Sequence, residues 1–258
     1  MWQEIVVGIL LAIIFCICTY ILYKQKSQPI ASGTFQYRSR CNYNSLLVLR
    51  LVMLAVYIVV IVVQASDMGV QMLKYYTVWN FLLQALFYIL SVRFIMAHHK
   101  AVNQPQAITT EYRVLNTIFD ISVSNSLMVV IVYWTLLYSP SMPWFSYIEH
   151  AINAVALSID FCLNPFLIKR TDAVLIALLP AIYAVFGWVS YYTWLDHVWP
   201  YNFLRMDSNA APGWYVAIFV GHLIVFGLVL LLSKAKEKII SPERPRLSTP
   251  LSDPINIA

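Results

Sequence analysis

Long apolar segments recur along this chain of 258 residues and constrain its fold more than any other feature. A helix needs about 20 predominantly apolar residues to cross the hydrocarbon core of a membrane. Candidate spans are residues 4–23, 45–65, 75–97, 113–138, 145–168, 173–195 and 213–233. Because 113–138 starts with polar residues, a six-span alternative stays open. We therefore predict an all-α, polytopic transmembrane helical bundle of six or seven spans, in the plasma membrane or the endoplasmic reticulum.

The composition excludes a soluble domain of this size, because hydrophobic residues make up 60% of the chain and charged residues 11%. With the N-terminus outside, most of the 17 Lys and Arg residues fall in inner loops or at inner span ends. This distribution follows the positive-inside rule and predicts an N-out, C-in topology. The net charge of +5 then reflects topology, and we predict no nucleic-acid partner.

Three regions follow from this pattern. Residues 1–44 are predicted to form an N-terminal anchor span and a cytoplasmic loop, and residues 45–233 a transmembrane bundle. Residues 234–258 are basic and rich in proline, which predicts a disordered cytoplasmic tail.

Residues 144–170 combine the length of a span with the most regular polar stripe in the sequence. At helical spacing this stripe contains Ser146, Glu149 or His150, Asn153, Asp160 and Asn164. Asn80 and Gln84 form a similar face in the third segment, and His222 is a single polar group deep in the last one. Ionisable groups that face lipid are costly, so we expect these side chains to face a polar interior.

Four charged residues are predicted to lie in the inner half of this bundle: Arg50, Arg93, Asp120 and Asp160. Pairing within such a cluster would offset the cost of immersing the charges. Three roles stay open: a structural clasp between helices, a proton or ion relay in which Asp120 or Asp160 changes protonation, and a site for lipid phosphate.

Neither a metal site nor another cofactor is predicted. His98 and His99 are adjacent, so their side chains diverge by about 100° on a helix. Cys16 and Cys18 lie on different faces of the first segment with no histidine nearby.

Short motifs between residues 45 and 233 carry a family resemblance. They are Tyr76-Thr77-Val78-Trp79-Asn80, His150-Ala151-Ile152-Asn153-Ala154-Val155, Asp160, Pro165, and Trp199-Pro200-Tyr201 after an aromatic sixth segment. This pattern resembles the rolling stone family of multi-pass membrane proteins. It is more distantly similar to the androgen-induced membrane proteins that hydrolyse fatty acid esters of hydroxy fatty acids. The hydrolase resemblance implies a lipid ester as ligand, whereas the polar faces of the third to fifth segments indicate membrane lipids.

The hydrolase resemblance also implies candidate catalytic residues. That family places a threonine nucleophile in a Lys-Tyr-x-Thr run, which Lys74-Tyr75-Tyr76-Thr77 resembles. Its His-x-x-His pattern falls on His150 and Asn153, so the second position departs from the family. If the second histidine is the family's base, activity by that mechanism is lost.

Position along the chain gives a separate argument for Thr77 and His150. Both lie close to the outer ends of their segments, so a hydroxyl and an imidazole can meet at one depth, and a threonine needs such a base to become nucleophilic. Interfacial packing and hydrogen bonding are the alternative roles of these two residues.

Three functions are therefore open. The leading one is a rolling stone-like membrane protein that handles or senses lipid without assigned catalysis. The second is an intramembrane threonine hydrolase of fatty acid esters. The third is a proton-coupled transporter that uses Asp120 and Asp160, although no inverted repeat is visible.

Overall fold

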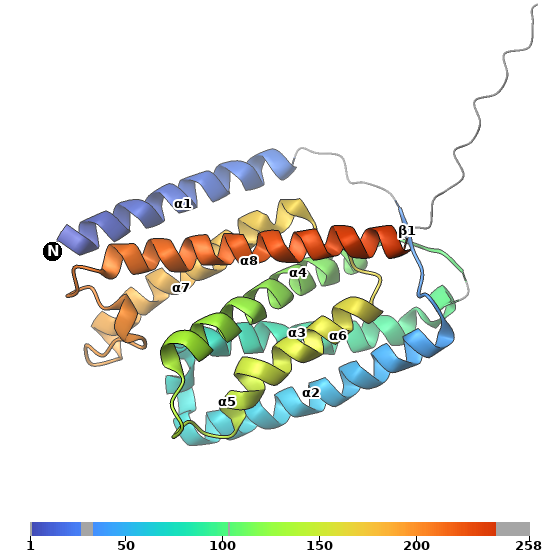
Figure 1. The fold of residues 1–258 in the computed structure, drawn as a ribbon, viewed down its shortest axis with the longest axis horizontal. Helices are drawn as coiled ribbons and strands as arrows, with labels where there is room; N and C mark the ends of the chain where they lie inside the picture. The colour runs from blue at the N-terminus through green and yellow to red at the C-terminus, as the bar shows by residue number, and fades with distance from the viewer. Residues whose placement is uncertain (1, 27–32, 103, 241–258) are drawn as a thin grey trace, which may run out of the picture.

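The computed structural model describes residues 2–26, 33–102 and 104–240, which form a bundle of helices (Figure 1). The α-helices are α1 Trp2–Lys26, α2 Arg40–Met68, α3 Tyr76–Ala97, α4 Thr110–Val132, α5 Phe145–Tyr147, α6 Asn153–Leu163, α7 Ala173–Thr193 and α8 Ala211–Ile240. Two π-helical turns, Tyr133–Leu137 and Ile148–Ile152, follow α4 and α5. Short 3-10 turns occupy Gly69–Lys74, His99–Val102, Arg170–Asp172 and Asn202–Leu204.

One small antiparallel strand pair accompanies the helices. Strand β1 (Thr34–Phe35) pairs with β2 (Gln106–Ala107), with Thr34 opposite Ala107. The Phe35 ring stacks on Tyr112 of α4 at a centroid distance of 4.5 Å. The pair therefore ties the segment before α2 to the segment before α4 at one end of the bundle.

Consecutive long helices run back and forth, so that the N-terminus of α1 and the end of α8 lie at opposite ends of the bundle (Figure 1). Six helices of the described chain are long and apolar enough to cross a membrane. The predicted all-α, multi-pass architecture is confirmed at this level. An N-out orientation and a definite span count stay predictions.

The segment that falls short of these six is not the one that the sequence indicated. Thr110–Leu137 is among the six despite its polar start. Residues 145–163 are divided by a π-helical turn and carry several inward polar groups, which lower their hydropathy. The six-span alternative therefore removes 145–168 from the count of spans, not 113–138.

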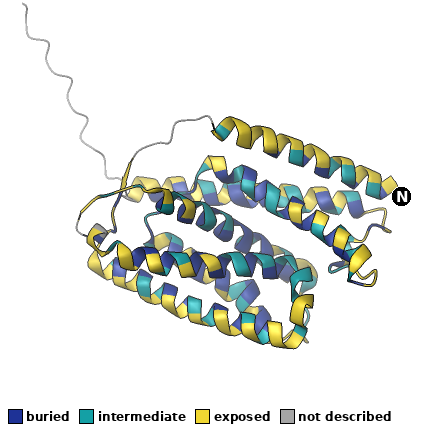
Figure 2. Ribbon diagram, turned by 180° about the vertical axis from the view of Figure 1, so that it is seen from behind, coloured by how far each residue is buried: buried dark blue, intermediate teal, exposed yellow. Residues whose placement is uncertain are grey.

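Burial follows the pattern expected of a membrane bundle. Exposed residues cover the outward faces of the long helices, and buried residues line the inside (Figure 2). Many exposed side chains are large and apolar, including Ile9, Val52, Ile224 and Leu228. An apolar outer surface of this extent indicates contact with lipid.

Two apolar cores hold the helices together. The larger one joins α2, α3, α4, α6 and α8, and the smaller one packs α1 against α7 and α8. The predicted boundary at residue 44 needs correction, since α1 belongs to the bundle through residues such as Val7 and Leu11.

The predicted C-terminal tail also begins later than expected. Residues 234–240 belong to α8 and are not disordered, because Lys236 is buried and bonded inside the protein. The remainder of the predicted tail, 241–258, lies outside the described residues, as does 27–32 of the predicted inner loop.

Candidate functional site

The polar stripe of residues 145–163 faces the interior of the bundle. Asn153, at the start of α6, donates from Nδ2 to Oε1 of Gln84 on α3 at 3.4 Å. The same oxygen accepts a hydrogen bond from the Tyr57 hydroxyl of α2. Asn80, one turn before Gln84, is fully buried with both amide atoms unpartnered. Of the residues predicted to form a polar interior, Asn80, Gln84 and Asn153 are thus gathered between α2, α3 and α6.

The π-helical turn Ile148–Ile152 determines which polar groups face inward. The sequence left Glu149 and His150 as alternatives for one position of the stripe, but both side chains are buried, with exposed fractions of 3% and 7%. A π turn is wider than an α turn, so neighbouring side chains diverge less around the axis. Both groups therefore reach the interior from successive positions.

These two residues line a cavity of about 410 Å³, here called the Glu149 cavity. It lies beside the loops that the predicted topology places outside, and its wall contains Gln64, Met68, Tyr75, Thr77, Val78, Tyr133, Leu137, Met142, Pro143, Phe145, Ser146, Glu149, His150, Pro200 and Tyr201. Gln64 hydrogen-bonds the Glu149 carboxyl group. Glu149 Oε1 and His150 Nδ1 are buried without a partner, so the cavity carries unused hydrogen-bonding capacity.

Thr77 lines the same cavity as His150. Its hydroxyl bonds the phenol of Tyr201, which also accepts the Tyr76 N–H at 3.0 Å. Burial raises the pKa of Tyr201 to about 12, against the opposing effect of the Thr77 hydrogen bond. Tyr201 is therefore a neutral phenol at physiological pH.

His150 is held away from a base's position in this structure. Its ring stacks on Tyr133 at a centroid distance of 3.6 Å and an interplanar angle of 5°. Within the described parts of the chain, no hydrogen bond joins it to Thr77. The two candidate catalytic residues share a cavity without forming an activated pair.

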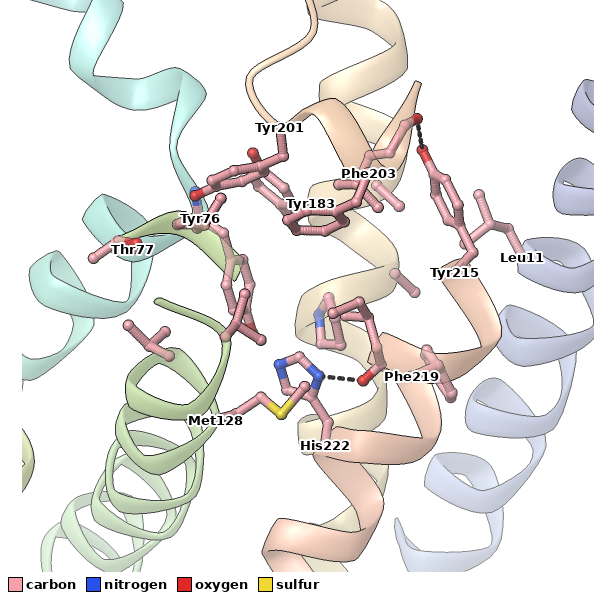
Figure 3. A pocket seen from close by; sticks show the side chains of 18 of the residues that line it. Leu11, Tyr76, Thr77, Met128, Tyr183, Tyr201, Phe203, Tyr215, Phe219 and His222 are labelled. Carbon is pink, nitrogen blue, oxygen red and sulfur yellow. Dashed lines mark hydrogen bonds between the residues drawn. The ribbon is translucent and has the colours of Figure 1, made fainter. Parts of the chain in front are cut away.

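A second hollow, the His222 pocket, lies between α1, α3, α4, α7 and α8 (Figure 3). Its walls are mainly apolar and aromatic, and include Leu11, Tyr76, Met128, Ala181, Tyr183, Ala184, Phe203, Tyr215, Ile218 and Phe219. His222 projects into it from α8, with Nδ1 2.7 Å from the carbonyl oxygen of Ile218. A carbonyl only accepts, so Nδ1 carries the proton and Nε2 is left as an acceptor in the neutral ring. This Nε2 is buried without a partner.

The two hollows adjoin each other. Thr77, Tyr133, Leu137 and Tyr201 belong to the walls of both. The Glu149 cavity contributes the polar groups and the His222 pocket the apolar surface. Together they form one interior region that is polar near the loops and apolar deeper in the bundle.

The predicted inner charges divide into separate groups. Arg50 of α2 forms a bidentate pair with Asp160 of α6, at 2.8 Å from Nε to Oδ2 and 3.0 Å from Nη2 to Oδ1. Both side chains are buried, and the guanidinium also lies over the rings of Phe87 and Phe166. Asp160 accepts a further bond from Asn164 at 2.7 Å.

Arg93 requires a correction, because it does not belong to the polar interior. Its side chain is 71% exposed and pairs with Glu111 of α4 at 2.5 Å. The position near the end of α3 lets the long side chain reach the surface instead of the bundle axis. Asp120 is buried but lies apart from the Arg50 pair, where its carboxylate accepts from Asn116 at 2.6 Å and from the Lys169 N–H at 2.9 Å.

Residues 164–169, which link α6 to the turn before α7, are non-helical, and Asn164, Phe166 and Ile168 among them are buried. Helix α6 ends at Leu163, directly before Asn164-Pro165, because proline removes a backbone donor and clashes with the preceding turn. Non-helical backbone at this depth must be satisfied by protein groups. Ser233 of α8 accepts the Ile168 N–H at 2.8 Å, and Lys236 donates to the Phe166 carbonyl at 2.8 Å.

Sequence reasoning missed several of these residues. Lys236 falls within the predicted tail. Gln64 lies near the C-terminal end of α2, where only its spacing from Tyr57 indicates that its side chain faces the interior. The signal available for Lys236 was its helical spacing of three from Ser233. Among the described residues, no group of three His, Cys, Asp or Glu side chains could hold a metal ion.

Comparisons with protein-family models, with curated proteins and with solved structures found no match for this chain. The geometry of the interior therefore carries the functional argument.

Proposed function

We propose that this multi-pass membrane protein binds an amphiphilic lipid inside its own helix bundle, without catalysis as its main role. The observation that carries the proposal is the shared wall of the Glu149 cavity and the His222 pocket. A lipid head fits the polar end and an apolar tail the deeper end. Lipid handling of this kind agrees with the leading function that the polar faces of the sequence indicate.

The tail alone would give little affinity. A lipid tail in the bilayer is already in hydrocarbon, so moving it into an apolar pocket gains no hydrophobic free energy. Packing contacts and the polar head must supply the preference for the protein. Met128, whose thioether side chain adapts its shape easily, lies beside His222 in the pocket wall and is able to accommodate a tail.

Photo-crosslinking tests this proposal. A single-chain lipid with a diazirine on its tail, irradiated with the purified protein, is expected to label Ile218, Phe219 or His222, which line the pocket. Leu223 and Ile224 follow on the same helix but face outward, with exposed fractions of 40% and 58%. Labelling confined to these outward residues, unaffected by excess unlabelled lipid, would contradict an interior site.

The orientation of this site follows from the N-out, C-in topology, which we retain as part of the proposal. The distribution of basic residues supports it. The Glu149 cavity then opens toward the outer or lumenal side of the plasma membrane or the endoplasmic reticulum.

A threonine hydrolase of lipid esters is the second candidate, because Thr77 and His150 line the same cavity. Catalytic contacts often tighten only when substrate binds, so the absence of a bond between them in this state leaves the mechanism available. Hydrolysis of branched fatty acid esters, lost in Thr77→Ala and His150→Ala but kept in the exposed control Thr135→Ala, would establish this function. No turnover by well-folded protein on such esters would dismiss it.

The proton-coupled transporter has less support. Arg50 holds Asp160 in a bidentate pair. Such contacts favour the structural clasp, since a proton relay needs a carboxyl group that exchanges partners. Proton uptake by reconstituted protein that disappears in Asp120→Asn would reverse this order.

A further inference from the structure

We propose that the Glu149 cavity binds the ammonium head group of an amphiphile. This inference rests on the proposed lipid binding and adds the chemical class of the head. The cation would lie against the Glu149 carboxyl group, among the aromatic side chains of the cavity, while its tail extends past Thr77 into the His222 pocket.

Glu149 has a buried carboxyl oxygen that lacks a hydrogen-bond partner in the described part of the chain. The side chain is 3% exposed, one part of its carboxyl group bonds Gln64, and Oε1 has no partner. A buried carboxyl group that lacks a partner is costly, and a charged donor offsets that cost best. No Lys or Arg of the described chain forms an ion pair with Glu149. A ligand that carries a cationic donor would therefore supply the partner that Glu149 lacks.

Aromatic side chains form part of the wall of the Glu149 cavity. Tyr75, Tyr133, Phe145 and Tyr201 line the cavity around Glu149 and His150. Aromatic faces attract ammonium groups, and cages of such rings are a common way to recognise them. Lys74 already places its own ammonium 5.3 Å from the centroid of the Tyr75 ring. This contact shows an ammonium group against one aromatic ring of the wall.

The absence of basic side chains among the described residues of the cavity wall further restricts the head group. These residues include no Lys or Arg, so an anionic head that carries no ammonium group of its own would find no basic side chain in the wall. An uncharged head would leave Glu149 without a cation. An ammonium group, as in a long-chain amine or a choline lipid, fits the charge and the aromatic surroundings together.

A binding panel of amphiphiles with one chain length tests the inference. Its arms are a sphingoid base, which carries an amine and no phosphate, a lysophosphatidylcholine, a monoacylglycerol and a fatty acid. Wild-type protein in detergent is compared with Glu149→Gln and with the control Glu111→Gln, whose acid lies on the surface beside Arg93.

Wild type and Glu111→Gln are expected to bind the sphingoid base about tenfold more tightly than the monoacylglycerol. Glu149→Gln should lose this preference while its affinity for the monoacylglycerol stays unchanged. Tighter binding of the choline lipid than of the sphingoid base would identify the choline source of the same ammonium chemistry. Equal affinity of wild type for the cationic and neutral lipids would overturn the ammonium assignment and leave lipid binding intact. No binding of any arm would overturn both.

A second variant pair guards against a folding defect in Glu149→Gln. Tyr75→Phe keeps an aromatic face and should retain the preference for the ammonium lipid, whereas Tyr75→Leu should weaken it. Equal preference in both variants, with Glu149→Gln unaltered as well, would contradict the proposal.

Discussion

The buried pair of Arg50 and Asp160 shows what single residues contribute to this bundle. The predicted topology places both in the inner half of the bundle, so the sequence allowed them to meet in one charged cluster without predicting this pair. The bidentate geometry was not predictable, because it depends on how α2 and α6 pack. Arg93 was predicted at a similar depth, but its side chain is exposed at the surface, where it pairs with Glu111. The position of a residue along its predicted span thus indicates which charges are able to pair. The direction of each side chain depends on how the helices pack.

Asp160→Asn should destabilise the protein by about 3–5 kcal/mol, because it leaves the buried Arg50 guanidinium without its counter-charge. The double variant Arg50→Met with Asp160→Leu should recover most of this loss, since no unpaired charge stays inside. Unfolding in a denaturing detergent measures both.

The exposed pair gives the control for this measurement. Glu111→Gln, which removes the partner of Arg93, should cost only about 0–1 kcal/mol. Equal losses in Asp160→Asn and Glu111→Gln would show that Asp160 is no clasp.

At the scale of elements, local rules predicted where helices end but not what holds them. Pro165 follows the end of α6 at a position where proline cannot continue the helix. The bonds from Ser233 and Lys236 to residues 166–168 span about seventy positions of the chain and have no local signal. The π turn at Ile148–Ile152 likewise escaped prediction, although it places both Glu149 and His150 inside. These long-range features build the site.

Gly221 tests the approach of α8 to α4. A Cβ atom at this position would lie 2.7 Å from Cε of Met128, so Gly221→Ala must displace the thioether that lines the His222 pocket. We expect lipid affinity to fall about tenfold, or ~1.4 kcal/mol. Equilibrium binding of the photoreactive lipid measures the change.

The chain offers a matched control on the same helix. A Cβ at Gly227 meets nothing within 4 Å, so Gly227→Ala should leave affinity unchanged. Adding Met128→Ala to Gly221→Ala should restore binding. Indistinguishable affinities in Gly221→Ala and Gly227→Ala would exclude Met128 from the binding surface.

For the whole molecule, composition and the spacing of apolar segments were sufficient to predict a helical membrane bundle. The span count was harder, because residues 145–163 exchange apolar for polar side chains where they line the interior. The polar side chains that line the interior site also lower the hydropathy by which a membrane span is recognised in the sequence. The orientation rests on the distribution of basic residues and is open to direct test.

On intact cells that carry the protein in the plasma membrane, a membrane-impermeant thiol reagent is expected to label Ser208→Cys, because the N-out topology places the loop before α8 outside. Cys41, which is exposed near the start of α2, should react only after permeabilisation. Cys16, Cys18 and Cys162 are replaced by alanine in this experiment. The reverse pattern of labelling would invert the topology.

The most direct test of interior lipid binding is the amount of lipid that co-purifies with the protein, measured by mass spectrometry. Ala184 lines the His222 pocket and is buried, whereas Val185 beside it on α7 is 40% exposed on the outer face. A tryptophan at position 184 fills the pocket, and one at 185 faces the membrane. Wild type and Val185→Trp should retain a stoichiometric amphiphile that Ala184→Trp, still monodisperse, has lost. Equal lipid content in all three proteins would contradict the account.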